Sequence, residues 1–123
     1  MSYELVTEKK EGYLLVTASG KRSFETVLAI TKDVMSACAR EDVKKALVDI
    51  RMLEGRLDTL ESFMIPDRHF PKLRDRNVLS RCAIIDLKEA EERFKFFENV
   101  SVNRGFFLRF FLDTDKAVEW LAK

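Results

Sequence analysis

The sequence predicts an α/β fold: an N-terminal β-hairpin is followed by right-handed β-α crossovers, which build a mostly parallel five-stranded sheet with helices mainly on one face. Near the start, a glycine lies between two segments in which apolar and polar residues alternate. After them, short apolar runs are separated by segments in which apolar residues recur at helical spacing. Near the end, a run of phenylalanines precedes a short helical segment. The 123 residues, 46% of them hydrophobic, are expected to form a single domain, 1–123.

The chain is expected to begin with two antiparallel strands and a long helix. Residues 3–9 and 13–19 alternate between apolar and polar side chains, and Gly12 lies in the turn between them. Ser23 is a suitable N-cap for a helix that runs to about Arg40, because apolar residues recur there at helical spacing. These elements predict a hairpin followed by the first crossover.

The middle of the chain is expected to hold a buried strand and an interrupted helix. Residues 45–51 are rich in Ala, Leu, Val and Ile, which predicts the strand. Asp58 and Glu61 then have the spacing of a capping box at a helix start. We expect this helix to be broken, because Pro66 and Pro71 each remove a backbone donor.

The second half repeats the strand and helix pattern. Residues 80–87 predict a third crossover strand, and an amphipathic helix starts at about Lys88. The last strand is predicted over residues 106–112, and Asp113 or Thr114 caps a final helix. If successive strands are neighbours in the sheet, the crossover helices all lie on one face, and the other face is left without a helix layer.

Composition excludes several classes of protein. The 22 Lys and Arg residues balance 21 Asp and Glu, and the net charge of +1 argues against a nucleic-acid partner. No apolar run is long enough for a transmembrane segment and no secretory signal opens the sequence, so we expect a cytoplasmic protein. Cys38 and Cys82 lie within apolar patterns, which is typical of buried thiols in a reducing compartment.

The last third of the chain carries a family resemblance. Residues 98–105 read Glu-x-Val-x-Val-Asn-Arg-Gly, a hydrophobic strand and an aspartate follow, and residues 117–121 read Ala-x-x-Trp-Leu. These features resemble the STAS-like superfamily, which contains the anti-sigma-factor antagonists and small uncharacterised bacterial proteins. The resemblance implies a STAS-like fold, akin to that of the lipid-transfer CRAL-TRIO domains.

The resemblance also implies a site of phosphorylation. The antagonists carry an Asp-Ser-Ser/Thr-Gly motif whose serine is phosphorylated at the start of a helix. The nearest match here is Asp58-Thr59, which makes Thr59 the candidate phospho-acceptor. Leu60 and Glu61 stand where the motif has a small residue and a glycine, and helix capping by Asp58 and Glu61 is the alternative explanation.

Three aspartates are candidates for a metal site. Asp49, Asp86 and Asp113 come at or near the ends of three predicted strands, where converging carboxylates can bind Mg²⁺ and a phosphoryl group. The favoured alternative is that Asp86 and Asp113 cap helices and that Asp49 pairs with an arginine. No nucleophile or general base accompanies them, so we expect no catalytic residue, no metal and no cofactor.

Basic side chains form a second candidate site. They are able to hold a phosphate group or an acidic partner, and a solvated loop is the alternative. His69 lies among them without a cysteine or second histidine that would complete a metal site. The candidate anion patch consists of Arg68, Lys72, Arg74 and Arg76.

Aromatic residues form the third candidate site, because seven of the ten phenylalanines follow Arg93. Phe107, Arg109 and Phe111 share the face of the last strand that is expected to lack a helix, and Leu47 is expected to join them there. An exposed surface of this kind is typical of an interface, and core packing is the alternative.

These observations predict a non-enzymatic STAS-like protein-interaction module. We expect a homodimer in a bacterial regulatory or scaffolding role, with a regulatory protein as a further partner. The alternative is a carrier of a small hydrophobic ligand or lipid, with a pocket between the helices and the sheet. The residues expected to line that pocket are Phe63, Met64, Phe94 and Phe97.

Overall fold

The computed structural model describes residues 3–69 and 79–123 and contains one sheet with the strand order β1-β2-β3-β4-β5. β1 is antiparallel to β2, and the other neighbouring strands are parallel. The predicted α/β class, with its N-terminal hairpin and mostly parallel sheet, is confirmed. The strands are β1 (Tyr3–Lys10), β2 (Tyr13–Lys21), β3 (Lys45–Glu54), β4 (Arg81–Ile85) and β5 (Leu108–Phe111).

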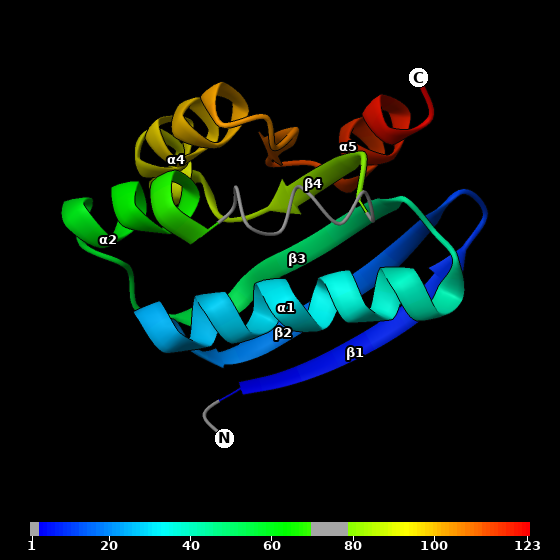
Figure 1. Ribbon diagram of the computed structural model, residues 1–123, viewed down its shortest axis with the longest axis horizontal. Helices are drawn as coiled ribbons and strands as arrows, with labels where there is room; N and C mark the ends of the chain where they lie inside the picture. The colour runs from blue at the N-terminus through cyan, green and yellow to red at the C-terminus, as the bar shows by residue number, and fades with distance from the viewer. Residues whose placement is uncertain (1–2, 70–78) are drawn as a thin grey trace.

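Helices follow β2, β3, β4 and β5 (Figure 1). As predicted, the helix after β3 is interrupted, because it passes at Ile65 into a π-helical turn that contains Pro66. The part of that prediction that concerns Pro71 lies outside the described residues. The helical elements are α1 (Phe24–Glu41), α2 (Thr59–Met64), η1 (Ile65–His69), η2 (Lys88–Ala90), α4 (Glu91–Asn103) and α5 (Thr114–Leu121).

Side-chain caps determine where three helices begin. The Ser23 hydroxyl accepts a hydrogen bond from the backbone N–H of Thr26 at 3.1 Å, as predicted for the start of α1. The Asp58 carboxylate accepts from the backbone N–H of Glu61 at 2.7 Å, and the Glu61 carboxylate accepts from the backbone N–H of Asp58 at 3.1 Å, so the capping box of α2 is confirmed. Asp113 caps α5.

The larger core lies between the sheet and the helices that connect its parallel strands. Side chains alternate along a strand, so every second residue of β2 to β5 faces this layer. Figure 1 shows α1 in front of the sheet and α2 next to α4. Buried members of this core include Val16, Val48, Ile84 and Leu108 from the sheet and Val34, Met35 and Phe97 from the helices.

The helix α5 packs on the opposite face of the sheet, which corrects the expectation that this face has no helix. Ala117 and Leu121 are buried against Leu47, Ala83 and Ile85. The rule that places helices on one face holds for helices that connect two parallel strands, whereas α5 does not connect two strands of the described sheet. Leu47 is only 1% exposed, so its assignment to an interaction surface is wrong.

Two basic side chains anchor the C-terminal end of α5 to the sheet. Lys45 Nζ donates to the Leu121 carbonyl at 2.5 Å, and Arg81 Nη1 donates to the Trp120 carbonyl at 2.7 Å. The Arg81 guanidinium also lies 5.3 Å from the centre of the Trp120 ring. Positive charge suits the carboxyl end of a helix, and these contacts dock Trp120 and Leu121 on the sheet.

The strand β3 extends beyond its predicted end at residue 51 and shapes one edge of the sheet. After a register shift between Thr17 and Ser19, β2 and β3 remain paired as far as Lys21 and Glu54. The backbone N–H of Arg22 then donates to the Glu54 carbonyl at 2.7 Å. This pairing holds the loops that follow β2 and β3 side by side. None of the described helices is both long and apolar enough to cross a membrane.

Candidate functional site

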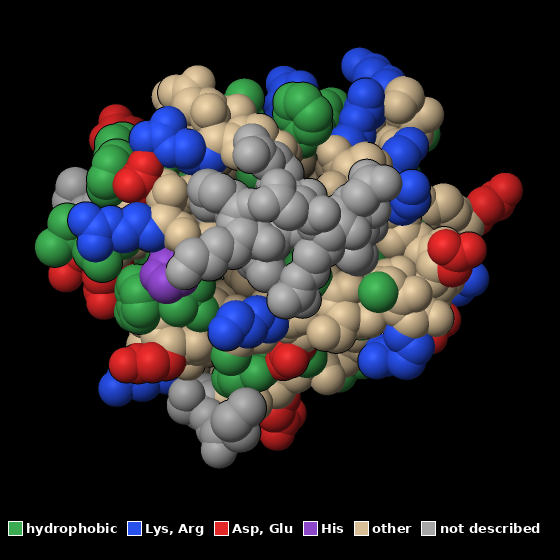
Figure 2. Space-filling view, viewed as in Figure 1, with side chains coloured by type: hydrophobic (Ala, Val, Ile, Leu, Met, Phe, Trp, Pro, Cys, Tyr) green, Lys and Arg blue, Asp and Glu red, His purple; other side chains and the backbone are tan. Residues whose placement is uncertain are grey.

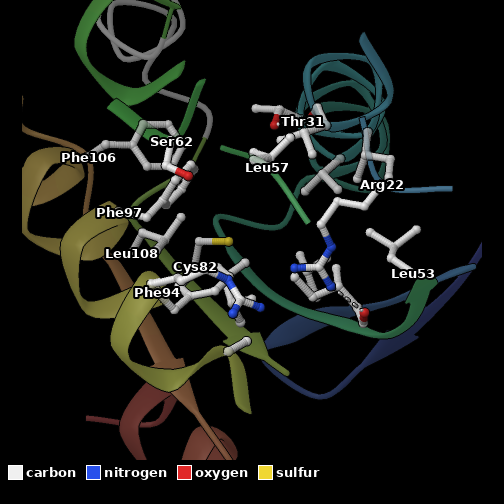
Figure 3. Close-up of a pocket in the computed structure, with 18 of the residues that line it drawn as sticks. Arg22, Thr31, Leu53, Leu57, Ser62, Cys82, Phe94, Phe97, Phe106 and Leu108 are labelled. Atoms are coloured by element: carbon white, nitrogen blue, oxygen red, sulfur yellow. Dashed lines mark hydrogen bonds between the residues drawn. The ribbon is translucent and has the colours of Figure 1, made fainter. Parts of the chain in front are cut away.

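An apolar cavity of about 110 Å³ lies between the helices and the sheet (Figure 3). Of the residues expected to line such a pocket, Phe94 and Phe97 do so, whereas Phe63 and Met64 do not. Inward-facing residues of β3, β4 and β5 form its floor, and α1 and α4 form its walls. Representative lining residues are Val48, Cys82 and Leu108 from the sheet and Val34, Phe94 and Phe97 from the helices.

Aromatic packing holds one wall of the cavity against the last strand. The Phe94 ring stacks on Phe110 of β5 with ring centroids 5.3 Å apart, and it packs on Phe97 at 5.4 Å. Phe106, which precedes β5, is also buried in this core. The wall formed by α4 is therefore fixed to the sheet, and the cavity lies between this wall and α1.

The charged residues that line the cavity are all basic in the described part of the chain. Arg22, Arg56 and Arg93 line it, together with polar Thr31 and Ser62, and none of the described aspartates or glutamates does. Arg22 follows β2, Arg56 follows β3, and Arg93 lies in the first turn of α4 after β4. Ligands of open α/β sheets commonly bind at these carboxyl ends of parallel strands.

A buried ion pair holds the Arg22 side chain in place. Its Nη1 lies 3.0 Å from Oδ2 of Asp86, and the two side chains are only 11% and 3% exposed. Its Nη2 donates to the Ile50 carbonyl at 3.2 Å. The remaining donor, Nε, is buried and has no acceptor among the described residues. Buried donors without an acceptor are rare in proteins, so this atom needs an explanation.

Arg56 and Arg93 lie near each other at the surface end of the site. Both contribute to a second, surface hollow that also includes Asp58. Arg93 Nη1 donates to the Glu89 carbonyl at 3.2 Å, but among the described residues neither guanidinium forms an ion pair. The carboxylate of Asp58 is engaged in the capping box of α2. The mouth of the cavity therefore carries the two positive charges of Arg56 and Arg93 and the single negative charge of Asp58.

The two cysteine thiols are buried, as predicted. Burial raises the pKa of Cys38 to about 11 and that of Cys82, on the cavity floor, to about 12. The thiolate is the nucleophilic form of cysteine. Neither thiol is therefore suited to nucleophilic chemistry at neutral pH.

The three aspartates are held by separate partners. Asp49 Oδ2 lies 2.7 Å from Nη2 of Arg51, and hydrogen bonds from this guanidinium hold the pKa of Asp49 below its usual value. Asp113 caps α5 as predicted, whereas Asp86 pairs with Arg22, so the prediction of a capping role for Asp86 is wrong. Within the described ranges, no three His, Cys, Asp or Glu side chains come together as metal ligands.

Most of the predicted anion patch falls outside the described residues. Lys72, Arg74 and Arg76 lie in the segment 70–78, and Arg68 is exposed in η1. The ring of His69 packs edge-on against Phe24 with centroids 5.6 Å apart. Figure 2 shows that side chains of both signs occur on the visible face of the molecule. The anion patch stays a prediction.

The candidate phospho-acceptor lies at the start of a helix. Thr59 is the first residue of α2 and directly follows the N-cap Asp58. Its side chain is not among the described parts of the structure, so phosphorylation of Thr59 stays a prediction.

The aromatic surface predicted for the last strand is partly covered. Phe111 packs against Trp120 of α5 with ring centroids 5.7 Å apart, and the Arg109 guanidinium lies 5.5 Å from the centre of the Phe111 ring. Phe107 is 60% exposed, and Arg109 is exposed as well. Phe107 and Arg109 therefore remain as a candidate interaction surface.

Comparison with known proteins identifies similar structures. No protein-family model matches the chain, and no curated protein matches it. An anti-sigma factor antagonist from Mycobacterium paratuberculosis is similar with a TM-score of 0.59 and 14% identity, over 99% of this chain and 96% of that chain. An uncharacterised protein of the DUF3478 family with a SpoIIAA-like fold, from Shewanella loihica, is similar with a TM-score of 0.57 and 24% identity, over 98% and 94% of the two chains. These similarities show that the chain has the fold of an anti-sigma factor antagonist and of a SpoIIAA-like protein, which is the fold that the resemblance of its last third implied.

Proposed function

We propose that the protein is a non-enzymatic STAS-like binding module whose ligand is a small hydrophobic molecule held in the cavity between the helices and the sheet. The observation that carries this proposal is the cavity itself, about 110 Å³ in volume and lined by apolar side chains from both layers. Protein interiors are close-packed and contain few voids larger than a water molecule. At about 24 cal/mol per Å³, a void of 110 Å³ costs about 2.6 kcal/mol, and a ligand that fills it recovers free energy of this order.

The volume of the cavity limits the size of the buried part of the ligand. An engineered apolar cavity of about 150 Å³ stays dry and binds benzene. The present cavity of about 110 Å³ is therefore suited to one aromatic ring or a short alkyl chain. Arg56 is exposed and also lines the cavity, so the ligand has access from the surface near this residue.

Titration of the ¹⁵N-labelled protein with 1-hexanol tests the proposal by NMR. We expect saturable amide shifts in the strands and helices that line the cavity, including Val48, Cys82 and Phe97. The variant Phe107→Ser is the control, because Phe107 does not line the cavity and its loss should leave binding unchanged. Shifts that do not saturate, or that are scattered over the surface, would contradict a cavity ligand.

A second candidate function is protein binding, which the exposure of Phe107 favours. Phe107 and the exposed Arg109 offer an aromatic ring and a guanidinium, the side chains that are enriched at protein interfaces. The backbone N–H of Phe110 already donates to the Glu98 carboxylate at 3.1 Å, which opposes strand pairing at this edge of the sheet. Contact is therefore expected through side chains, with a second copy of the chain or with a regulatory protein.

Sedimentation velocity tests the homodimer. Wild type and the control Leu87→Asp, whose leucine is exposed elsewhere, should both sediment as dimers, and Phe107→Asp should sediment as a folded monomer. A wild-type monomer at tens of micromolar would contradict the dimer, because stable interfaces have much lower dissociation constants.

A further inference from the structure

The cavity has an apolar end and a basic end. Figure 3 shows Arg22 across the cavity from Phe97, Phe106 and Leu108. A molecule that spans this space meets aromatic and aliphatic side chains at one end and a guanidinium at the other. The cavity is therefore matched to an amphipathic ligand with a polar group on one end.

We propose that the ligand is a small amphipathic oxyanion, whose carboxylate or phosphate head binds Arg22, Arg56 and Arg93 while its short apolar body fills the cavity. This inference rests on the proposed function, because it names the chemical class that the same cavity accepts.

The balance of charge supports an anion. Three guanidinium groups line the cavity, and no carboxylate of the described residues does. Asp86 neutralises only Arg22. Arg56 and Arg93 share a surface hollow with Asp58, whose single negative charge offsets only one of their two positive charges. Like charges beside a region of low dielectric repel one another, and an anion between Arg56 and Arg93 reduces the repulsion that remains. Guanidinium groups bind carboxylate and phosphate oxygens through paired hydrogen bonds, which gives the head group a defined orientation.

The unpaired donor of Arg22 supports the same conclusion independently. Its Nη1 and Nη2 are occupied by Asp86 and by the Ile50 carbonyl, which fix the guanidinium in one orientation. Its Nε is buried without an acceptor among the described residues. An oxygen of the ligand head group supplies that acceptor. A water molecule is a weaker explanation, because a buried water needs several polar partners and this cavity is mainly apolar.

Calorimetric titration with three probes of equal chain length tests the proposal. The probes are hexanoate, hexyl phosphate and the uncharged 1-hexanol. We expect at least one anion to bind wild type about tenfold more tightly than the alcohol, a difference of about 1.4 kcal/mol. The tighter of the two anions identifies the head group. The difference in affinity between the tighter-binding anion and 1-hexanol should decrease in high salt, because salt screens charge interactions near the surface.

A charge-matched pair of variants assigns the effect to the cavity. The double variant Arg56→Gln/Arg93→Gln should weaken anion binding about tenfold and leave 1-hexanol binding unchanged. Its control, Lys32→Gln/Arg40→Gln, removes the same charge from exposed positions of α1 that do not line the cavity, and should change neither affinity. Equal affinities for alcohol and anions, or an Arg56→Gln/Arg93→Gln variant that binds anions like wild type, would overturn the oxyanion and leave the hydrophobic ligand intact. If none of the probes binds, both proposals are overturned.

Discussion

Replacement of Cys82 by leucine should stabilise the protein and weaken ligand binding. Cys82 lies on the cavity floor, and leucine at this position extends into the empty space. If the larger side chain fills roughly half of the 110 Å³, at about 24 cal/mol per Å³ the gain in the free energy of unfolding is about 1.3 kcal/mol. In a core without a cavity, the same enlargement typically costs about 1 to 3 kcal/mol. The sign of the change therefore reports whether the cavity is empty.

Urea denaturation monitored by Trp120 fluorescence measures this change, and calorimetry with 1-hexanol measures binding. Ala83→Leu is the matched control, because Ala83 is the next residue of β4, faces α5 and does not line the cavity. We expect Ala83→Leu to be destabilised and to retain binding. A Cys82→Leu variant that is destabilised as much as Ala83→Leu, and that still binds 1-hexanol like wild type, would show that Cys82 does not border an empty cavity that binds the ligand.

Three further predictions follow from the packing, the buried ion pair and the thiols. Trp120→Ala should lower the free energy of unfolding by about 3 kcal/mol, because the indole packs on Phe111 and Arg81. A loss no larger than that of an ordinary surface substitution would contradict this packing. Asp86→Leu should cost about 3 kcal/mol of unfolding free energy by leaving the buried Arg22 charge unpaired, and adding Arg22→Met should recover much of this loss. Strict additivity in the double-mutant cycle of Arg22→Met and Asp86→Leu contradicts the pairing. The pKa of the Cys38 thiol is about 11 in the native protein and near 9 in the unfolded chain, so the free energy of unfolding should fall as the pH rises from 9 to 11. Urea denaturation across this pH range should show a smaller fall for Cys38→Ala than for wild type. Equal falls would contradict the raised pKa of Cys38.

The sequence predicted the elements that depend on local signals. The caps at Ser23, Asp58 and Asp113 occur where they were expected, because a capping side chain bonds to a backbone group only two or three residues away. The hairpin was also predictable from the sequence, because its turn requires a positive φ, which is 86° at Gly12 and favours glycine there. These features require no knowledge of distant contacts.

The position of α5 was not predictable in the same way. Its apolar residues Ala117 and Leu121 show that it packs on something, but not on which face of the sheet. The crossover rule determines the face only for a helix that is followed by another parallel strand. The assignment of Leu47 to an exposed surface failed for this reason, whereas Phe107 is exposed as expected.

The basic end of the cavity was missed because its residues are far apart in the sequence. Arg22, Arg56 and Arg93 each follow a different parallel strand, and only the pairing of these strands brings them to one edge. At these strand ends the aspartates had been predicted as candidate site residues, and the arginines had not. The strand ends themselves were a usable signal, since ligands commonly bind there. The cavity volume depends on side-chain packing and was not accessible from the sequence.

Intermolecular NOEs between hexanoate and the methyl and aromatic protons of the protein would show whether the ligand lies in the cavity and in which orientation. We expect NOEs from the terminal methyl group of hexanoate to Phe97 and Leu108, and from the methylene beside the carboxylate to the Arg22 side chain. NOEs confined to exposed residues such as Phe107, or a reversed orientation with the methyl group at Arg22, would contradict this expectation.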